Sequence, residues 1–294
     1  MVTSHHEENA ALYQGDCLEV FPFVPDESID CVITSPPYPG VNNMWGELFT
    51  AENFDLAHEF LDKVWNECLR VLKPGCKLII NIANTKRRPY LPNVSRVYWW
   101  ARNKIEPLGE IIWNKGYGQN GTAWGSFRSP ADMSLTDQHE YILVFRKYGD
   151  RDKPEEFEKI STHDFKSWRN SIWNISPAKA SKVNHIASFP EQLPTRLITL
   201  YSFENETILD PFMGRGTTGL AALKLHRCFI GMDNNPKYFS LAKKNVKSAV
   251  SSPSFLTPSN KVLHPTAFGA GTAKAISLLD SIQEDDSPAI FSGG

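Results

Sequence analysis

The sequence has few cysteines and no long apolar run. None of its hydrophobic stretches approaches the roughly 18 residues of a membrane-spanning helix, so no membrane association is expected. The N-terminal "MVTSHHEENA" lacks the basic-then-apolar pattern of a signal peptide. The five cysteines show no C-x-x-C spacing, so neither a zinc or other metal site nor a disulfide framework is predicted. These absences favour a cytoplasmic protein.

The sequence also lacks an excess of charge of either sign. A formal net charge of −2 over 294 residues argues against a wholly basic nucleic-acid binder, although it allows local basic patches. The hydrophobic content of 41% and the charged content of 22% are typical of a globular protein. The length suits one large α/β domain or two small ones.

Strand-like and helical patterns alternate along most of the chain, which favours an α/β fold with a parallel sheet. The predicted strands are residues 11–13, 29–34, 76–83, 109–114, 139–147, 206–212 and 227–233. The predicted helices are residues 55–72, 94–105, 190–202, 217–225 and 236–248. Residues 251–294 are rich in Ser, Pro, Gly and Thr and are predicted to form a disordered tail after a domain of residues 1–250.

The segment "TSPPYPG" follows the apolar strand at 29–34 directly. Two consecutive prolines end the strand and hold the next turn stiff. They also leave no backbone N–H nearby to compete for the Ser35 hydroxyl or the Pro36 carbonyl. The turn therefore offers acceptors and an aromatic ring, that of Tyr38, at the end of a buried strand.

The segment "ILDPFMGRGTTGLAALKL" places a glycine-rich turn between a strand and a helix, which lets a ligand approach the backbone. The next strand ends in Asp233, 23 positions after Asp210, a spacing that suits a carboxylate on the two hydroxyls of a ribose. A dinucleotide site and a plain packing turn are the competing interpretations. A dinucleotide site usually opens its sheet, whereas this motif comes late, so the chain looks circularly permuted.

Together, "TSPPY" at 34–38 and "DPFMGRGTTGLAALKLHRCFIGMDNNPKY" at 210–238 resemble the permuted, beta-class amino-methyltransferases of DNA. The segments "RVLKPGCKLIINIAN" at 70–84 and "ASFPEQLPTRLI" at 187–198 are similar too. The resemblance covers roughly residues 11–248 and is strongest to the cytosine-N4-specific members of type II restriction-modification systems.

This resemblance implies a Rossmann-like methyltransferase fold whose seven-stranded, mostly parallel sheet has one antiparallel strand. It implies a catalytic half at 11–147, a small target-recognition region at about 148–186 and a cofactor-binding half at 187–250. The implied reaction moves a methyl group from S-adenosyl-L-methionine to the N4 amino group of cytosine in double-stranded DNA. The implied location is the cytoplasm or the nucleoid, and the implied oligomeric state is a monomer or weak dimer. The implied partner is a restriction endonuclease that acts on the same DNA site without direct contact.

The resemblance also implies roles for individual residues. The catalytic residues would be Ser35, Pro36, Pro37 and Tyr38, with Ser35 Oγ and the Pro36 carbonyl accepting the two amine hydrogens and Tyr38 stacking on a flipped base. The cofactor-binding residues would be Asp16, Asp210, Pro211, Phe212, Gly214, Gly216, Thr217, Thr218, Asp233, Phe189 and Pro190. For Asp16 a helix N-cap, and for Phe189 a core position, are the alternatives.

Basic residues in two regions are predicted to contact DNA. They are Lys86, Arg87, Arg88, Lys166, Arg169, Lys179 and Lys182. Trp99 and Trp100 are expected to pack a helix against the sheet instead.

Other functions stay open at this point. A serine at the head of the tetrapeptide is a neutral acceptor, whereas adenine enzymes of this family more often carry aspartate, so cytosine N4 is favoured. Adenine N6 is the close alternative, and RNA or a glutamine side chain is a possible substrate. A cofactor-binding or DNA-binding module without turnover is the alternative from another class.

Overall fold

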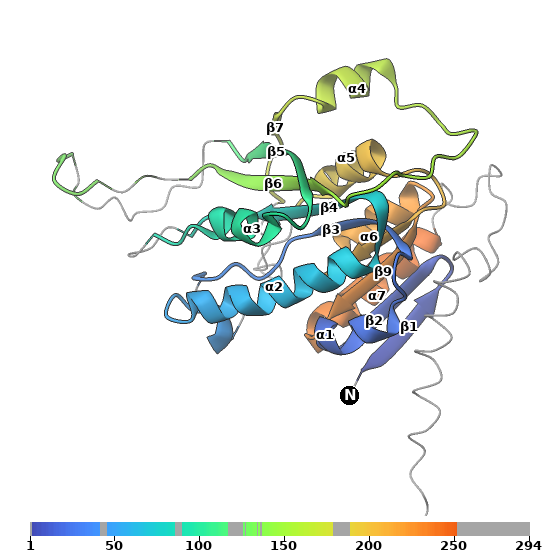
Figure 1. Cartoon of the computed structure of the whole chain (residues 1–294), viewed down its shortest axis with the longest axis horizontal. Helices are drawn as coiled ribbons and strands as arrows, with labels where there is room; N and C mark the ends of the chain where they lie inside the picture. Colours follow the sequence, from blue (N-terminus) through green and yellow to red (C-terminus); the bar gives the residue numbers. More distant parts are fainter. Residues whose placement is uncertain are drawn as a thin grey trace, which may run out of the picture.

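A computed structural model describes the chain over residues 2–41, 46–85, 90–116, 126, 128–133, 135, 137–178 and 189–251. These residues form one nine-stranded sheet in the order β1-β2-β9-β8-β3-β4-β6-β5-β7, shown in Figure 1. The strands are β1 (Thr3–Glu7), β2 (Ala10–Gln14), β3 (Ile29–Thr34), β4 (Leu72–Ile82), β5 (Glu106–Asn114), β6 (His139–Arg146), β7 (Ile172–Asn174), β8 (Thr207–Asp210) and β9 (Cys228–Asp233).

All seven predicted strands are present, but the predicted count is wrong because one further strand extends each edge of the sheet. β1 is a polar run whose side chains are only partly covered, so it carries no buried stripe. β7 is three residues long, too short for a period-2 pattern. Short and polar strands are typical of sheet edges, where a hydrophobic pattern is weakest.

Strand directions agree with the implied fold. Among the seven predicted strands only β6 is antiparallel to its neighbours, β4 and β5. β1 adds a second antiparallel strand at the opposite edge, beside β2. Because β6 runs in reverse, its first residues lie at the same edge of the sheet as the last residues of β3 and β4.

Helices cover both faces of the sheet. One face packs on α2 (Phe54–Val71) and α3 (Asn93–Ala101), and the other on α5 (Gln192–Tyr201), α6 (Thr217–Lys224) and α7 (Pro236–Val250) (Figure 1). α2 shows why: its buried residues recur every three or four positions, which puts them on one side of a helix. They are Ala57, His58, Leu61, Val64, Trp65, Cys68 and Val71.

Four short elements complete the description. They are α1 (Cys17–Val20), α4 (Thr162–Trp168) and the 3-10 turns η1 (Phe21–Phe23) and η3 (Glu47–Phe49). The sequence patterns predicted neither α4 nor the two turns, because each is too short to show a helical period. β4 begins at Leu72, directly after α2, and so includes residues 73–75, which lay between the predicted helix at 55–72 and the predicted strand at 76–83.

β3 and β8 are direct neighbours, with Cys31 paired to Ile208 and Val32 to Leu209, although most of the chain lies between them. After β3 the chain crosses one face through α2 to β4, and after β8 it crosses the other face through α6 to β9. Such a divergence of neighbouring parallel strands opens a crevice at their carboxyl ends. The "SPPY" and glycine-rich segments therefore meet at this crevice, in the permuted chain order.

The remaining expectations concern covalent and membrane features. All five cysteines are free and buried, and no described helix is both long and apolar enough to span a bilayer. The predicted tail from residue 252 onward lies outside the described residues, as do residues 179–188 of the predicted recognition region.

Candidate active site

A cavity of about 830 Å³ opens at the carboxyl ends of β2, β9, β8, β3 and β4 and the start of β6. Its volume is in the upper part of the range of roughly 300–1,000 Å³ that is usual for ligand pockets. The predicted site residues that line it are Asp16, Ser35, Pro36, Pro37, Tyr38, Phe189, Asp210, Pro211, Phe212, Gly214, Thr217 and Asp233. Three other predicted residues, Pro190, Gly216 and Thr218, are not among the residues that line it.

Asp210 connects the "TSPPY" segment to the glycine-rich segment through hydrogen bonds. Its Oδ1 accepts hydrogen bonds from Thr34 Oγ1 at 2.7 Å and from the Phe212 N–H at 3.1 Å, and its Oδ2 accepts from Thr218 Oγ1 at 2.7 Å. Burial raises the pKa of the Asp210 carboxyl to about 6, although the hydrogen bonds from the two threonines oppose that rise. Since Thr34 precedes Ser35, Asp210 fixes where the catalytic turn begins relative to the glycine loop.

Asp233 ends β9 and anchors the other side of the glycine loop. Its two oxygens accept from the backbone N–H groups of Gly214 at 2.9 Å and Asn235 at 2.8 Å. Each carboxylate oxygen keeps a second acceptor position, which suits two neighbouring hydroxyls. Burial raises the pKa of Asp233 to about 6, while the two backbone hydrogen bonds lower it.

Different structural constraints require glycine at the three glycine positions of this segment. Gly214 and Gly216 have φ values of +52° and +76°, which side chains rarely adopt. A Cβ on Gly216 would lie 3.1 Å from Ala242 of α7, and one on Gly219 would lie 2.6 Å from the Phe229 ring. A Cβ on Gly214 would meet open space, so of the three Gly214 is the one that leaves the backbone accessible at the cavity.

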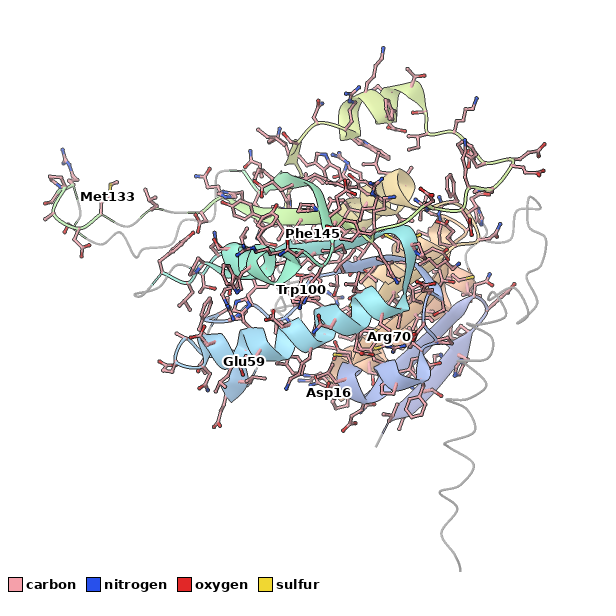
Figure 2. The ribbon with its side chains drawn as sticks, in the orientation of Figure 1. Asp16, Glu59, Arg70, Trp100, Met133 and Phe145 are labelled. Carbon is pink, nitrogen blue, oxygen red and sulfur yellow. The ribbon has the colours of Figure 1, made fainter. Side chains whose placement is uncertain are left out.

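Asp16 is both a helix cap and a lining residue. Its carboxylate accepts from the Leu18 N–H at 2.9 Å and so caps α1, as the alternative interpretation predicted. It also lines the cavity next to Asp233, because the Gly15 N–H donates to the Asp233 carbonyl at 3.1 Å. Figure 2 shows Asp16 at the start of α1, and the cap leaves one carboxylate oxygen for a ligand.

Ser35 and Tyr38 belong to a hydrogen-bonded network at the opposite wall of the cavity. Their hydroxyl oxygens lie 3.0 Å apart, and the Tyr38 hydroxyl donates to Glu140 Oε2 at 2.9 Å. Asn81 Nδ2 lies 2.8 Å from the Tyr38 oxygen and 2.6 Å from Glu140 Oε2. Burial, and next the charge of Glu140, raise the pKa of Tyr38 well above its usual value, so the phenol stays protonated.

Sequence reasoning did not predict Asn81, Glu140, Lys115 or Trp113, all of which line the cavity. They come from the ends of β4 and β5 and the start of β6. The only signal in the sequence is that each stands at the boundary of a predicted strand. That signal becomes informative once β6 is known to be antiparallel, since only then does Glu140 fall at the active-site edge.

The predicted DNA-binding residues fare differently. Lys86, Arg87, Arg88, Lys179 and Lys182 lie outside the described residues. Lys166 and Arg169 are exposed at the end of α4, which packs on α5 through Arg196, whose guanidinium lies 5.6 Å and 5.4 Å from the rings of Trp168 and Trp173. Figure 1 shows α4 above α5. The residues near β7 that line the cavity are Pro177 and Ala178, which follow this strand, whereas α4 precedes it.

The expectation that both Trp99 and Trp100 pack against the sheet is wrong for Trp99. Trp100 is 3% exposed, and its Nε1 donates to Asn66 of α2 at 2.9 Å, between the two helices in Figure 2. Trp99 is 65% exposed with the Arg102 guanidinium 5.6 Å from its ring centre. The buried stripe of α3 runs through Val94, Val97 and Trp100, and Trp99 falls beside it.

Comparisons with known proteins agree with this arrangement. A family model described as "DNA methylase" (N6_N4_Mtase) matches residues 29–244. The Type II methyltransferase M.MthZI of Methanothermobacter thermautotrophicus is 32% identical over 76% of this chain and 73% of its own length. M.MjaI of Methanocaldococcus jannaschii is 34% identical over 71% and 82%. YhdJ of Escherichia coli K12, a DNA adenine methyltransferase, is 28% identical over 84% and 86%.

Solved structures show the same fold. TTHA0409 of Thermus thermophilus, described as a DNA modification methylase and complexed with S-adenosyl-L-methionine, has a TM-score of 0.67 at 30% identity over 82% of this chain and 96% of that one. The cytosine-N4-specific PvuII DNA methyltransferase has a TM-score of 0.62 at 21% identity over 92% and 93%. The chain therefore belongs to the DNA methylase family, with an α/β methyltransferase fold and S-adenosyl-L-methionine as its cofactor.

Proposed function

We propose that this DNA methyltransferase acts on the exocyclic N4 amine of cytosine in double-stranded DNA, after the base has flipped out of the helix. The observation that carries the proposal is that one cavity is lined both by Ser35, Pro36 and Tyr38 and by the Asp233 and Gly214 pair. A methyl donor held at the second group would face an amine held at the first.

Some of the predicted cofactor residues suit direct contact with the cofactor, and others hold the glycine loop in place. Asp233 suits the two ribose hydroxyls through its free acceptor positions, and the remaining oxygen of Asp16 suits the adenine amine. Phe189, Phe212 and the backbone at Gly214 would border the methionine end. Asp210 and Thr218 bond to each other, so we place them as supports of the loop. S-adenosyl-L-methionine supplies an electrophilic methyl group on a sulfonium.

The amine is a poor nucleophile because its lone pair is delocalised into the ring of the base. Two acceptors for its hydrogens, Ser35 Oγ and the Pro36 carbonyl, favour a tetrahedral nitrogen whose lone pair points at the methyl group. Most of the acceleration then comes from alignment of the reacting atoms. A base reaches this position only outside the duplex, where the Tyr38 ring at the cavity wall offsets part of the lost stacking.

Ser35 supports cytosine as the target base. It is the first residue of the "SPPY" tetrapeptide and carries a neutral hydroxyl, whereas adenine enzymes of this family more often have aspartate at that position. Adenine N6 is the second candidate, and the likeness to YhdJ, a DNA adenine methyltransferase, favours it. The likeness to Type II methyltransferases supports a role in a restriction-modification system, beside an endonuclease that cuts the same site when it is unmethylated.

The deciding experiment is nucleoside analysis. Unmethylated genomic DNA is incubated with the protein and labelled S-adenosyl-L-methionine, digested, and resolved by chromatography with mass spectrometry. We expect label only in 4-methylcytosine. Label in 6-methyladenine alone would establish the second candidate, and cofactor binding without label in any base would indicate a non-catalytic module.

A further inference from the structure

A carboxylate lies directly behind the catalytic turn, and the reaction outlined above gives it no role. Glu140 Oε2 accepts from Tyr38 and Asn81, and its Oε1 forms an ion pair with Lys115. The Lys115 ammonium also lies 4.7 Å from the centre of the Trp113 ring. The Glu140 side chain is only 12% exposed, and in such surroundings a charged acceptor orients nearby donors strongly.

The ion pair fixes the direction of the hydroxyl protons. The Lys115 ammonium pairs with the Glu140 carboxylate, and a carboxylate can only accept hydrogen bonds. The Tyr38 hydroxyl has two acceptors within reach, Glu140 Oε2 at 2.9 Å and the Asn81 carbonyl at 3.2 Å. The nearer acceptor is also the charged one, so Tyr38 donates its single proton to Glu140. The Tyr38 oxygen is left to accept, one hydrogen from Asn81 at 2.8 Å and one from Ser35 at 3.0 Å. The Ser35 proton thus points away from the incoming amine, and its oxygen faces the amine as an acceptor.

We propose that Glu140 is a positioning residue for methyl transfer, which acts through Tyr38 to make Ser35 Oγ an acceptor and then receives the released proton. This role rests on the proposed function. As the amine nitrogen forms its bond to the methyl carbon, the carbon–sulfur bond breaks and its electron pair stays on sulfur. The nitrogen then gives one proton to Ser35, Ser35 gives its own to Tyr38, and Tyr38 gives its own to Glu140, which ends neutral.

The groups that surround Glu140 determine how its protonation appears in experiments. Lys115 comes from the end of β5, Tyr38 from the catalytic turn, and Asp137 and His139 from the approach to β6 and its first residue. Of these, Lys115 is the cation in direct contact with the carboxylate. His139 lines the same cavity as Glu140, so a His139 variant serves as a separate control.

The primary test is Glu140→Gln, whose amide can donate to Tyr38 and so reverse the hydroxyl chain. We expect the single-turnover rate on unmethylated genomic DNA to fall at least about 100-fold, the low end of what proton-transfer catalysis contributes. Cofactor affinity by calorimetry and the melting temperature should stay near the wild-type values. Glu140→Asp, which keeps the charge on a shorter stem, should recover part of the rate.

The pH profile separates this role from a structural one. A carboxylate that must receive the released proton makes the wild-type rate decline on the acid side, and Glu140→Gln should lack that decline. Lys115→Met keeps the carboxylate but removes the cation beside it, so the decline should move to higher pH. His139→Gln should retain the decline where the wild type has it.

A double-mutant cycle tests whether Glu140 acts through Tyr38. Tyr38→Phe removes the shared hydroxyl, so adding Glu140→Gln to it should cause little further loss, whereas independent roles would multiply the two losses. Multiplied losses, or a Glu140→Gln rate within threefold of wild type, would overturn this role alone. Failure of the wild-type protein to methylate DNA would instead overturn the proposed function and this role with it.

Discussion

The cavity wall around Asp210, Gly214 and Asp233 is held mainly by backbone donors and neighbouring threonines, whereas the wall around Ser35 and Tyr38 is held by side chains from three strands. We call them the cofactor wall and the base wall. Most of the cofactor wall comes from one contiguous stretch of 26 residues, 210 to 235, and only Asp16, Thr34 and Phe189 are added from elsewhere in the chain. The base wall exists only when β4, β5 and β6 are side by side.

This difference separates two kinds of function. A wall of fixed backbone donors suits a ligand that never changes, and the cofactor is the same for every enzyme of this kind. A wall of side chains from separate strands can be altered one residue at a time, which suits the part that must match a particular base. Damage to one wall should therefore leave the other working.

The largest effect should follow from breaking the base wall. Ser35→Ala removes an acceptor for the amine, and Tyr38→Ala removes both the ring and the hydroxyl that orients Ser35. We expect each to lower the single-turnover rate at least about 100-fold, because small errors of alignment at a reacting centre cost that much. Calorimetry should show nearly unchanged cofactor affinity in both variants.

Ser35→Thr is the matched control, since it keeps a hydroxyl at the same position. It should retain more activity than Ser35→Ala. Near-normal turnover in both alanine variants would remove "TSPPY" from the catalytic role, and a parallel loss of cofactor binding would show that the two walls are not separable.

A substitution in the cofactor wall should have a smaller effect, and it should lower cofactor affinity instead of the rate. Asp233→Ala would remove the two charge-assisted hydrogen bonds that we propose to the ribose, each worth about 1.5–3 kcal/mol, so cofactor affinity should fall at least tenfold. The rate at saturating cofactor and DNA should fall much less, because the base wall is intact. Unchanged affinity by calorimetry would place the ribose contact at another residue.

The same difference explains what the sequence could predict. Asp210, Gly214 and Asp233 are recognisable because strand end, turn and next strand end follow one another in the chain. Asn81, Lys115 and Glu140 are far apart, and nothing local marks them until β6 is known to run in reverse. β1, β7 and α4 were missed because polar or very short elements bury too little apolar surface to leave a pattern.

The affinity of the protein for its cofactor should depend on pH through Asp233. Burial raises the pKa of Asp233 to about 6, and the contact that we propose with both ribose hydroxyls needs the ionised carboxylate. Affinity for the cofactor should therefore rise with pH through 6 and level off near pH 7. From the protonated fraction, binding at pH 5 should be about tenfold weaker than at pH 7.

Asp233→Asn is the control for this titration. Its affinity should be low and nearly constant between pH 5 and pH 7, because no proton competes at that position. Since the pKa of Asp210 is also raised to about 6, an Asp233→Asn variant that keeps the full pH dependence would assign the titration to Asp210, which belongs to the same wall.

The smallest effect should come from α4, which lies outside both walls. Lys166 and Arg169 are exposed there, and we predict that both contact phosphates of the bound duplex. If each contacts one phosphate, the double variant Lys166→Ala/Arg169→Ala should lower the slope of log affinity against log salt by about 1.8. Its rate at saturating DNA should match the wild type, and the methylated base should be the same.

The matched control is Lys244→Ala/Lys247→Ala on α7, which removes the same charge from another exposed helix face and should leave the slope unchanged. Equal slopes for the wild type and both double variants would show that α4 stays off the DNA, and the predicted contacts would then have to come from the other basic residues.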